Sequence, residues 1–233
     1  MGDEQVNSSF QESTELLDDS PPSDDLAETD DLLRNIGVII VICSLLLVFG
    51  GESFSWWEIE MQVRSEGDNV GFTFKLGTTE LYADGYLGKE TKVSYSDTEC
   101  NCEEMDALFT NLRMMLLGLI CCSALLANIG YTGEKKHLVP RLLAGTFVIS
   151  LLILVYAFYS IPEIYDEETD FFKDIDEDPI FYGHIEKQDW LEDNIELDVY
   201  VGPSLGFFLP LLSLILSIYL IKIREISFKD VTG

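Results

Sequence analysis

The sequence predicts an α-helical membrane protein: a bundle of four transmembrane helices with a small antiparallel β-sheet in its first outer loop. The first observation is a conflict in composition, because 47% of the 233 residues are hydrophobic yet the formal net charge is −28. Such a chain separates apolar spans from acidic soluble parts. The second observation is a set of four long stretches without charge, at residues 35–51, 114–133, 142–162 and 199–221. Each is long enough to cross the hydrocarbon core, which takes roughly 20 apolar residues.

The N-terminal segment, residues 1–32, contains no Lys or Arg and few large apolar side chains. This composition cannot bury enough surface to offset the entropy of ordering, so we expect an acidic, disordered tail on the cytoplasmic side. The first span is predicted at residues 33–51. Residues 36–49 are apolar on every face, whereas an amphipathic helix of a soluble protein carries a polar stripe.

The first outer loop, residues 52–107, predicts a meander of three to five antiparallel strands. Its runs of aromatic and β-branched residues are separated by acidic and glycine-containing turns. The runs are WWEIEMQV (56–63), VGFTFKL (70–76), TELYADGYL (79–87) and TKVSYS (91–96). Trp56 and Trp57 open the first run, and we expect their indole rings at the membrane interface, where indoles are favoured.

The rest of the chain alternates spans and connections. We predict span two at 108–131, a basic cytoplasmic link at 132–140, span three at 141–162, an acidic outer loop at 163–198, span four at 199–221 and a cytoplasmic tail at 222–233. Lys135, Lys136 and Arg141 lie in or beside the link, and positive residues near span ends stay in the cytoplasm. We therefore expect the link and both termini inside, in a multi-pass protein of the plasma membrane. Interleaved aromatic residues indicate that part of the acidic loop packs on the first loop.

Cys100 and Cys102 close the first outer loop, and the other three cysteines lie within spans. In an oxidising compartment the two form a disulfide with each other, or each finds another partner. A structural disulfide is favoured over redox chemistry, and both are favoured over a metal site.

Asp174, Asp176 and Asp178 in the acidic loop resemble the start of a calcium loop. An EF-hand is excluded, because Pro179 occupies the position where its turn requires glycine. Looser calcium binding by the clustered carboxylates stays open, beside the simpler interpretation of a solvated acidic surface.

The predicted spans lack the buried ionisable residues that usually mark an ion path. The one charge at a span margin is Arg113, whose long side chain can reach outward and tie span two to an outer-loop carboxylate. His137 and His184 stand on different sides of the predicted membrane, so we expect no His-based triad or zinc site. We find no pattern of catalytic or cofactor-binding residues, and the acidity argues against a nucleic-acid partner.

The layout resembles the claudin and peripheral-myelin-protein superfamily of four-span proteins. LFTNLRMMLLGLICC (108–122), PRLLAGTFVISLLILVYAF (140–158) and VGPSLGFFLPLLSLIL (201–216) are similar to spans two, three and four of that family. The resemblance implies cytoplasmic ends and a β-rich first outer loop. It also implies that Arg113, near the outer edge of span two, is a structural tie.

These observations predict a non-enzymatic scaffold or adhesion protein, or an accessory subunit, that acts through its outer domain. Its partners would be the lipid bilayer and other membrane proteins, or further copies of itself. The alternative is a cation-binding channel subunit or a calcium-responsive membrane sensor that uses the three aspartates of the acidic loop.

Overall fold

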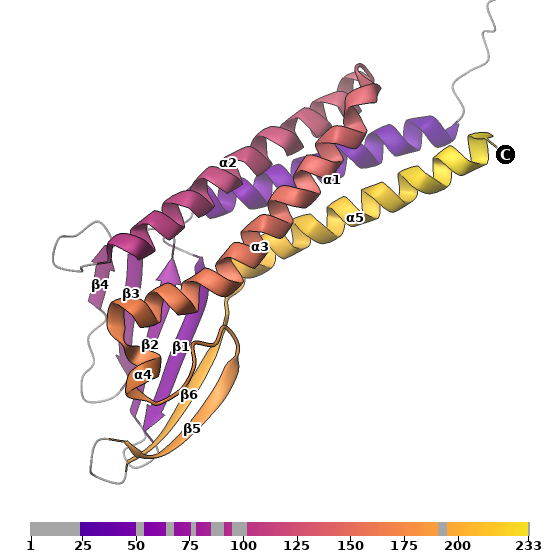
Figure 1. Cartoon of the computed structure of the whole chain (residues 1–233). Coiled ribbons are helices and arrows are strands. Elements are labelled where there is room, and N and C mark those ends of the chain that lie inside the picture. The colour runs from indigo at the N-terminus through magenta and orange to yellow at the C-terminus, as the bar shows by residue number, and fades with distance from the viewer. Residues whose placement is uncertain are drawn as a thin grey trace, which may run out of the picture.

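The computed structural model describes residues 24–49, 54–63, 68–75, 78–84, 91–94, 102–190 and 195–232. Within these residues four long helices form a bundle, and a β-sheet lies at one end of it (Figure 1). The elements are α1 (Asp24–Phe49), β1 (Ser55–Val63), β2 (Asp68–Lys75), β3 (Thr78–Asp84), β4 (Thr91–Ser94), α2 (Glu103–Thr132), the 3-10 helix η1 (Lys136–Leu138), α3 (Val139–Thr169), α4 (Phe171–Asp174), β5 (Gly183–Trp190), β6 (Ile195–Pro203) and α5 (Leu205–Thr232).

The bundle has the length and surface of a membrane domain. In the described part of the chain, the helices that are long and apolar enough to cross a membrane are Thr29–Phe49, Glu103–Thr132, Lys136–Thr169 and Leu205–Ile223. Their outward faces carry large apolar side chains, and Ile42, Met114, Leu152 and Ile215 are each more than half exposed. An apolar surface of this extent is unfavourable in water and favourable in lipid. The four predicted spans are confirmed, and the protein is a multi-pass membrane protein.

Helices α1 and α2 approach closely because two glycines lack a Cβ atom. A Cβ at Gly37 would lie 2.9 Å from a backbone nitrogen of α2, and one at Gly130 would lie 2.7 Å from the backbone nitrogen of Arg34. Small residues allow this approach between membrane helices. An ion pair between Asp30 and Lys136 joins α1 to the 3-10 helix η1, in the link between α2 and α3.

The described strands form one antiparallel sheet in the order β4-β3-β2-β1-β6-β5. Strands β1 to β4 confirm the meander predicted for the first outer loop. The structure adds two strands to it, because β6 pairs with the free edge of β1 and places Glu60 opposite Tyr200. Strands β5 and β6 follow α3 and α4 in the chain, so both loops contribute to a single sheet. The predicted packing of the second loop on the first is therefore confirmed as strand pairing.

The C-terminal end of α3 and the short helix α4 lie over one face of this sheet (Figure 1). On that face Trp57 and Phe74 contact Tyr165 of α3, with ring centroids 5.9 and 4.9 Å apart. Phe172 and Phe181 lie 6.4 and 6.2 Å from the Trp57 ring. We call these five side chains the aromatic core. Each buries a large apolar area, so the core fixes the sheet onto the bundle.

Helices α1 and α3 extend beyond the predicted limits of their spans. Helix α1 begins at Asp24, within the segment predicted to be disordered, and residues 1–23 lie outside the described residues. Acidic residues are favourable in the first turn of a helix because they face its positive dipole end. Helix α3 continues to Thr169 because Tyr165 and its neighbours pack on the sheet.

The predicted start of span four at residue 199 is wrong. Residues 199–203 belong to β6, and helix α5 begins at Leu205. Val199 and Val201 are 0% and 3% exposed in the sheet core. Their apolar side chains suit a buried strand as well as a membrane helix, so hydropathy alone did not separate the two.

Candidate functional site

The face of the sheet opposite the aromatic core carries mostly polar side chains. Successive strand residues point to opposite faces of a sheet. Glu58 and Glu60 therefore lie on the face opposite to the buried Trp57 and Ile59. Residues paired directly across antiparallel strands share a face. We call this the polar sheet face and define it by Glu58, Glu60, Gln62, His184, Glu186, Asp198 and Tyr200.

A shallow groove of about 530 Å³ lies on the polar sheet face. Glu58 and Glu60 line it, together with Tyr182 and Tyr200. The two tyrosines are 78% and 46% exposed. Tyr200 belongs to β6 and Tyr182 directly precedes β5, so neither is part of the apolar surface of the bundle. Tyrosine is enriched at protein interfaces, and carboxylates favour a basic partner. The groove therefore has the chemistry of a contact surface.

A polar cluster fixes this groove to the membrane domain. Glu58 Oε1 accepts hydrogen bonds from the hydroxyls of Ser55 and Ser204, at 2.6 and 2.7 Å. The backbone N–H of Ser204 also donates to the carbonyl oxygen of Trp56 at 3.0 Å. Hydrogen bonds to a charged acceptor are stronger than neutral ones. The start of β1 is thereby joined to the chain just before α5.

A second tie joins α3 to the beginning of α2. Glu168 Oε1 accepts the backbone N–H groups of Glu104 and Met105, both at 3.1 Å. These groups belong to the first helical turn, where backbone N–H groups have no partner within the helix. Cys102, at the N-cap position, makes no side-chain capping hydrogen bond. Glu168 therefore caps α2 from the neighbouring helix.

The two predicted interface tryptophans lie in the protein interior. Trp56 and Trp57 are both 0% exposed, so their indoles do not face lipid headgroups, contrary to the prediction. Trp57 belongs to the aromatic core. Trp56 packs against the start of α5, where a Cβ on Gly206 would come within 3.0 Å of its ring. Indoles suit an interface and a protein core equally, and here β6 and α5 supply the core.

The cysteine and arginine predictions stay open. Cys102 is half-buried, whereas Cys100 lies outside the described residues, so their disulfide remains a prediction. The three cysteines in the membrane helices are free thiols. Arg113 stands on an exposed side of α2, and its tie to an outer-loop carboxylate also remains a prediction.

The three aspartates of the proposed calcium site are exposed and lie around the end of α4. Asp174 ends that helix, and Asp176 adopts a left-handed backbone with a φ of 57°. Asp174, Asp176 and Asp178 do not belong to the group of three potential metal ligands that lie together among the described residues. Nearby, Lys173 Nζ donates a hydrogen bond of 2.6 Å to Asp170 Oδ1. The pKa of Lys173 is raised mainly by this hydrogen bond and, to a lesser extent, by the negative charge of Asp170. Calcium binding here stays a prediction.

The group of potential metal ligands found among the described residues is His184, Glu186 and Asp198. Their ligand atoms all lie within 4.8 Å of one another. From the sequence we expect no His-based zinc site, whereas the fold places His184 beside two carboxylates. The His-x-Glu spacing on a strand places two of these residues on one face, which the sequence could have indicated. Asp198 joins them because β6 pairs it with Glu186.

Comparison with known proteins adds no relative: the chain matches no protein-family model and no curated protein. The fold and the site define its class, a multi-pass membrane protein of four membrane-length helices that carries an antiparallel sheet. The layout of helices and sheet is consistent with the resemblance to claudins, but no family match supports it.

Proposed function

We propose that this protein is a non-enzymatic membrane scaffold or adhesion protein, or an accessory subunit, that acts through protein contacts of its sheet domain. The observation that carries the proposal is the groove on the polar sheet face, where Tyr182 and Tyr200 stand exposed beside Glu58 and Glu60. Hydrogen bonds from two serines hold Glu58 in place. A surface that is ordered before binding loses less entropy when a partner binds.

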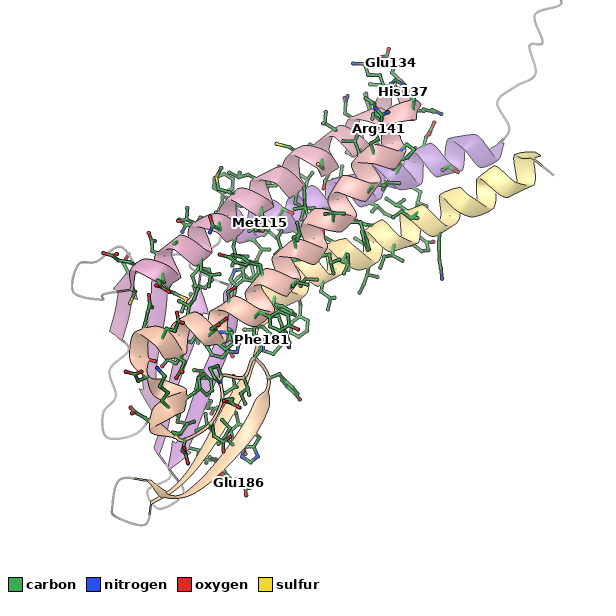
Figure 2. The ribbon with its side chains drawn as sticks, viewed as in Figure 1. Met115, Glu134, His137, Arg141, Phe181 and Glu186 are labelled. Atoms are coloured by element: carbon green, nitrogen blue, oxygen red, sulfur yellow. The ribbon has the colours of Figure 1, made fainter. Side chains whose placement is uncertain are left out.

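The proposal includes the orientation of the chain: the sheet outside the cell, and both termini in the cytoplasm. The described start of α1, the end of α5 and the α2–α3 link all lie at the end of the bundle remote from the sheet (Figures 1 and 2). That link carries Lys135, Lys136 and Arg141, and positive residues beside spans favour the cytoplasm. The claudin-like layout supports lateral contact with other membrane proteins or with further copies of this chain.

Site-specific photocrosslinking in native membranes tests this function. A benzophenone amino acid at Tyr200 would report contacts of the groove, and the same probe at Tyr131 is the matched control. Tyr131 is 77% exposed but lies near the α2–α3 link, at the other end of the bundle.

We expect an adduct of one defined mass from Tyr200 and none of that mass from Tyr131. Two differently tagged copies of the chain would tell a self-contact from a contact with another protein. A basic substitution in the groove, Glu60→Lys, should remove the adduct. The proposal fails if Tyr200 gives no adduct, or if Glu60→Lys leaves it unchanged.

A further inference from the structure

We propose that His184, Glu186 and Asp198 form a binding site for a transition-metal ion of the zinc type at the β5–β6 end of the polar sheet face. Their potential ligand atoms all lie within 4.8 Å of one another. Glu186 lies on β5 toward the tip of the sheet that is remote from the helices (Figure 2). The site adjoins the groove, because His184 also lines it. The inference does not depend on the orientation of the chain or on the proposed protein contacts.

The separation of two ligand atoms fits tetrahedral coordination. His184 Nε2 lies 3.4 Å from Asp198 Oδ1. Zinc binds histidine nitrogen and carboxylate oxygen at about 2.0–2.2 Å, which places two ligands of a tetrahedron about 3.4 Å apart. A metal ion therefore fits between these two atoms with little movement. Rotation of the exposed Glu186 side chain would bring its carboxylate to the same ion.

The backbone already places the three residues together. His184 and Glu186 are alternate residues of β5, and Asp198 stands directly opposite Glu186 on β6. The imidazole of His184 stacks on the ring of Tyr200, with centroids 4.4 Å apart and planes 8° from parallel. This contact limits the rotation of the imidazole, so one ligand is partly oriented before a metal binds.

The charges of Glu186 and Asp198 would be stabilised more by a divalent cation than by an ion pair with His184 alone. Two carboxylates that face each other across antiparallel strands repel. Asp198 is only 6% exposed, so water does little to screen that repulsion. A protonated His184 would supply one positive charge to the pair. A divalent ion would supply two and contact all three side chains.

The residue types select the class of metal. Imidazole nitrogen suits zinc, copper and nickel, whereas calcium takes six to eight oxygen ligands. Three protein ligands leave a fourth tetrahedral position for water. The inferred occupant is therefore an ion such as Zn²⁺, and calcium should not compete for it.

Metal titration of the full-length protein in detergent tests the inference. The protein would be purified through a tag without histidine, stripped with a chelator and titrated with Zn²⁺ by calorimetry. Co²⁺ would be titrated in parallel, because its visible absorption reports tetrahedral coordination by nitrogen and oxygen. We expect one ion per chain, and excess Ca²⁺ should not displace it.

The variants His184→Ala and Glu186→Gln change exposed side chains and should fold normally. Loss of a partner that only supports a metal ligand weakens binding about 10–100-fold, so loss of a ligand should weaken it at least about tenfold. His137→Ala and Glu163→Gln, exposed residues elsewhere in the chain, are the matched controls and should bind zinc as the unchanged protein does. Equal zinc affinity in His184→Ala, or no zinc binding by the unchanged protein, would overturn the inference.

Discussion

The indole Nε1 of Trp57 donates a hydrogen bond of 2.8 Å to the backbone carbonyl oxygen of Phe181. The two rings are also stacked, with centroids 6.2 Å apart and planes 12° from parallel. Trp57 belongs to β1, and Phe181 lies in the segment between α4 and β5. One pair of residues thus joins the two loops that form the sheet domain, through a polar and an apolar contact at once.

Removing this hydrogen bond should loosen the sheet domain. Trp57→Phe keeps an aromatic ring but leaves the carbonyl oxygen of Phe181 buried without its donor. Such a buried polar group costs about 1–3 kcal/mol. We expect a lower unfolding temperature for the detergent-solubilised protein, measured by its circular dichroism. Tyr182→Phe, at an exposed ring, is the control and should unfold like the unchanged protein. Equal stability of Trp57→Phe would show that the hydrogen bond contributes nothing.

The cap that Glu168 provides to α2 predicts a difference between two adjacent glutamates. Glu168→Ala removes the acceptor of two N–H groups in the first turn of α2, and loss of a helix cap costs about 0.5–2 kcal/mol. Glu167 is exposed and serves as the matched control. Chemical denaturation should show a lower free energy of unfolding for Glu168→Ala than for Glu167→Ala. If the two variants unfold alike, the cap is not a stabilising contact.

The spans and the first four strands could be predicted from the sequence because their signals are local. Uncharged stretches report membrane helices, and the alternation of Trp57, Ile59 and their polar neighbours reports a strand. The pairing of β6 with β1 could not be predicted in this way. Val199 and Val201 are apolar, and nothing within residues 199–203 shows that an edge of β1 is available to them.

The ligand group of the sheet face was missed for a related reason. His184 and Glu186 are two residues apart, so a predicted strand would have put them on one face. The position of Asp198 depends on the register of the β5–β6 hairpin, which contains an irregularity between Lys187 and Trp190. A one-residue change in register would move Asp198 to the other face. Composition and spacing carry no information on that register.

The surroundings of two glycines of α2 predict different effects for their substitution: Gly130 faces α1 closely, whereas Gly118 has space beside α3. A Cβ at Gly130 would lie 2.7 and 2.8 Å from backbone atoms of Arg34 and Asp30, which cannot move without shifting α1. Overpacking of this kind costs about 1–3 kcal/mol. A Cβ at Gly118 would meet only one side-chain atom of Ile149, at 3.7 Å.

Gly130→Ala should therefore lower the unfolding temperature of the detergent-solubilised protein. Gly118→Ala should leave it unchanged or raise it, because alanine favours a helix over glycine by about 1 kcal/mol. A stable Gly130→Ala protein would mean that α1 and α2 do not pack as closely in the membrane as they do in this structure.

The proposed orientation predicts which cysteine variants an impermeant reagent reaches. Tyr182 is 78% exposed on the sheet domain. Glu134 is exposed at the remote end of the bundle, beside Lys135 and Lys136 (Figure 2). With the sheet outside, a membrane-impermeant maleimide should label Tyr182→Cys on intact cells. Glu134→Cys should react only after permeabilisation, because the basic link stays in the cytoplasm.

The unchanged protein sets the background for this labelling, since it has five cysteines of its own. The reverse pattern, with Glu134→Cys labelled on intact cells, would place the sheet in the cytoplasm. The polar sheet face could not then meet partners outside the cell, and an adhesion role would be excluded. The zinc-type site would keep its geometry in either orientation, because all three of its ligands come from the β5–β6 hairpin.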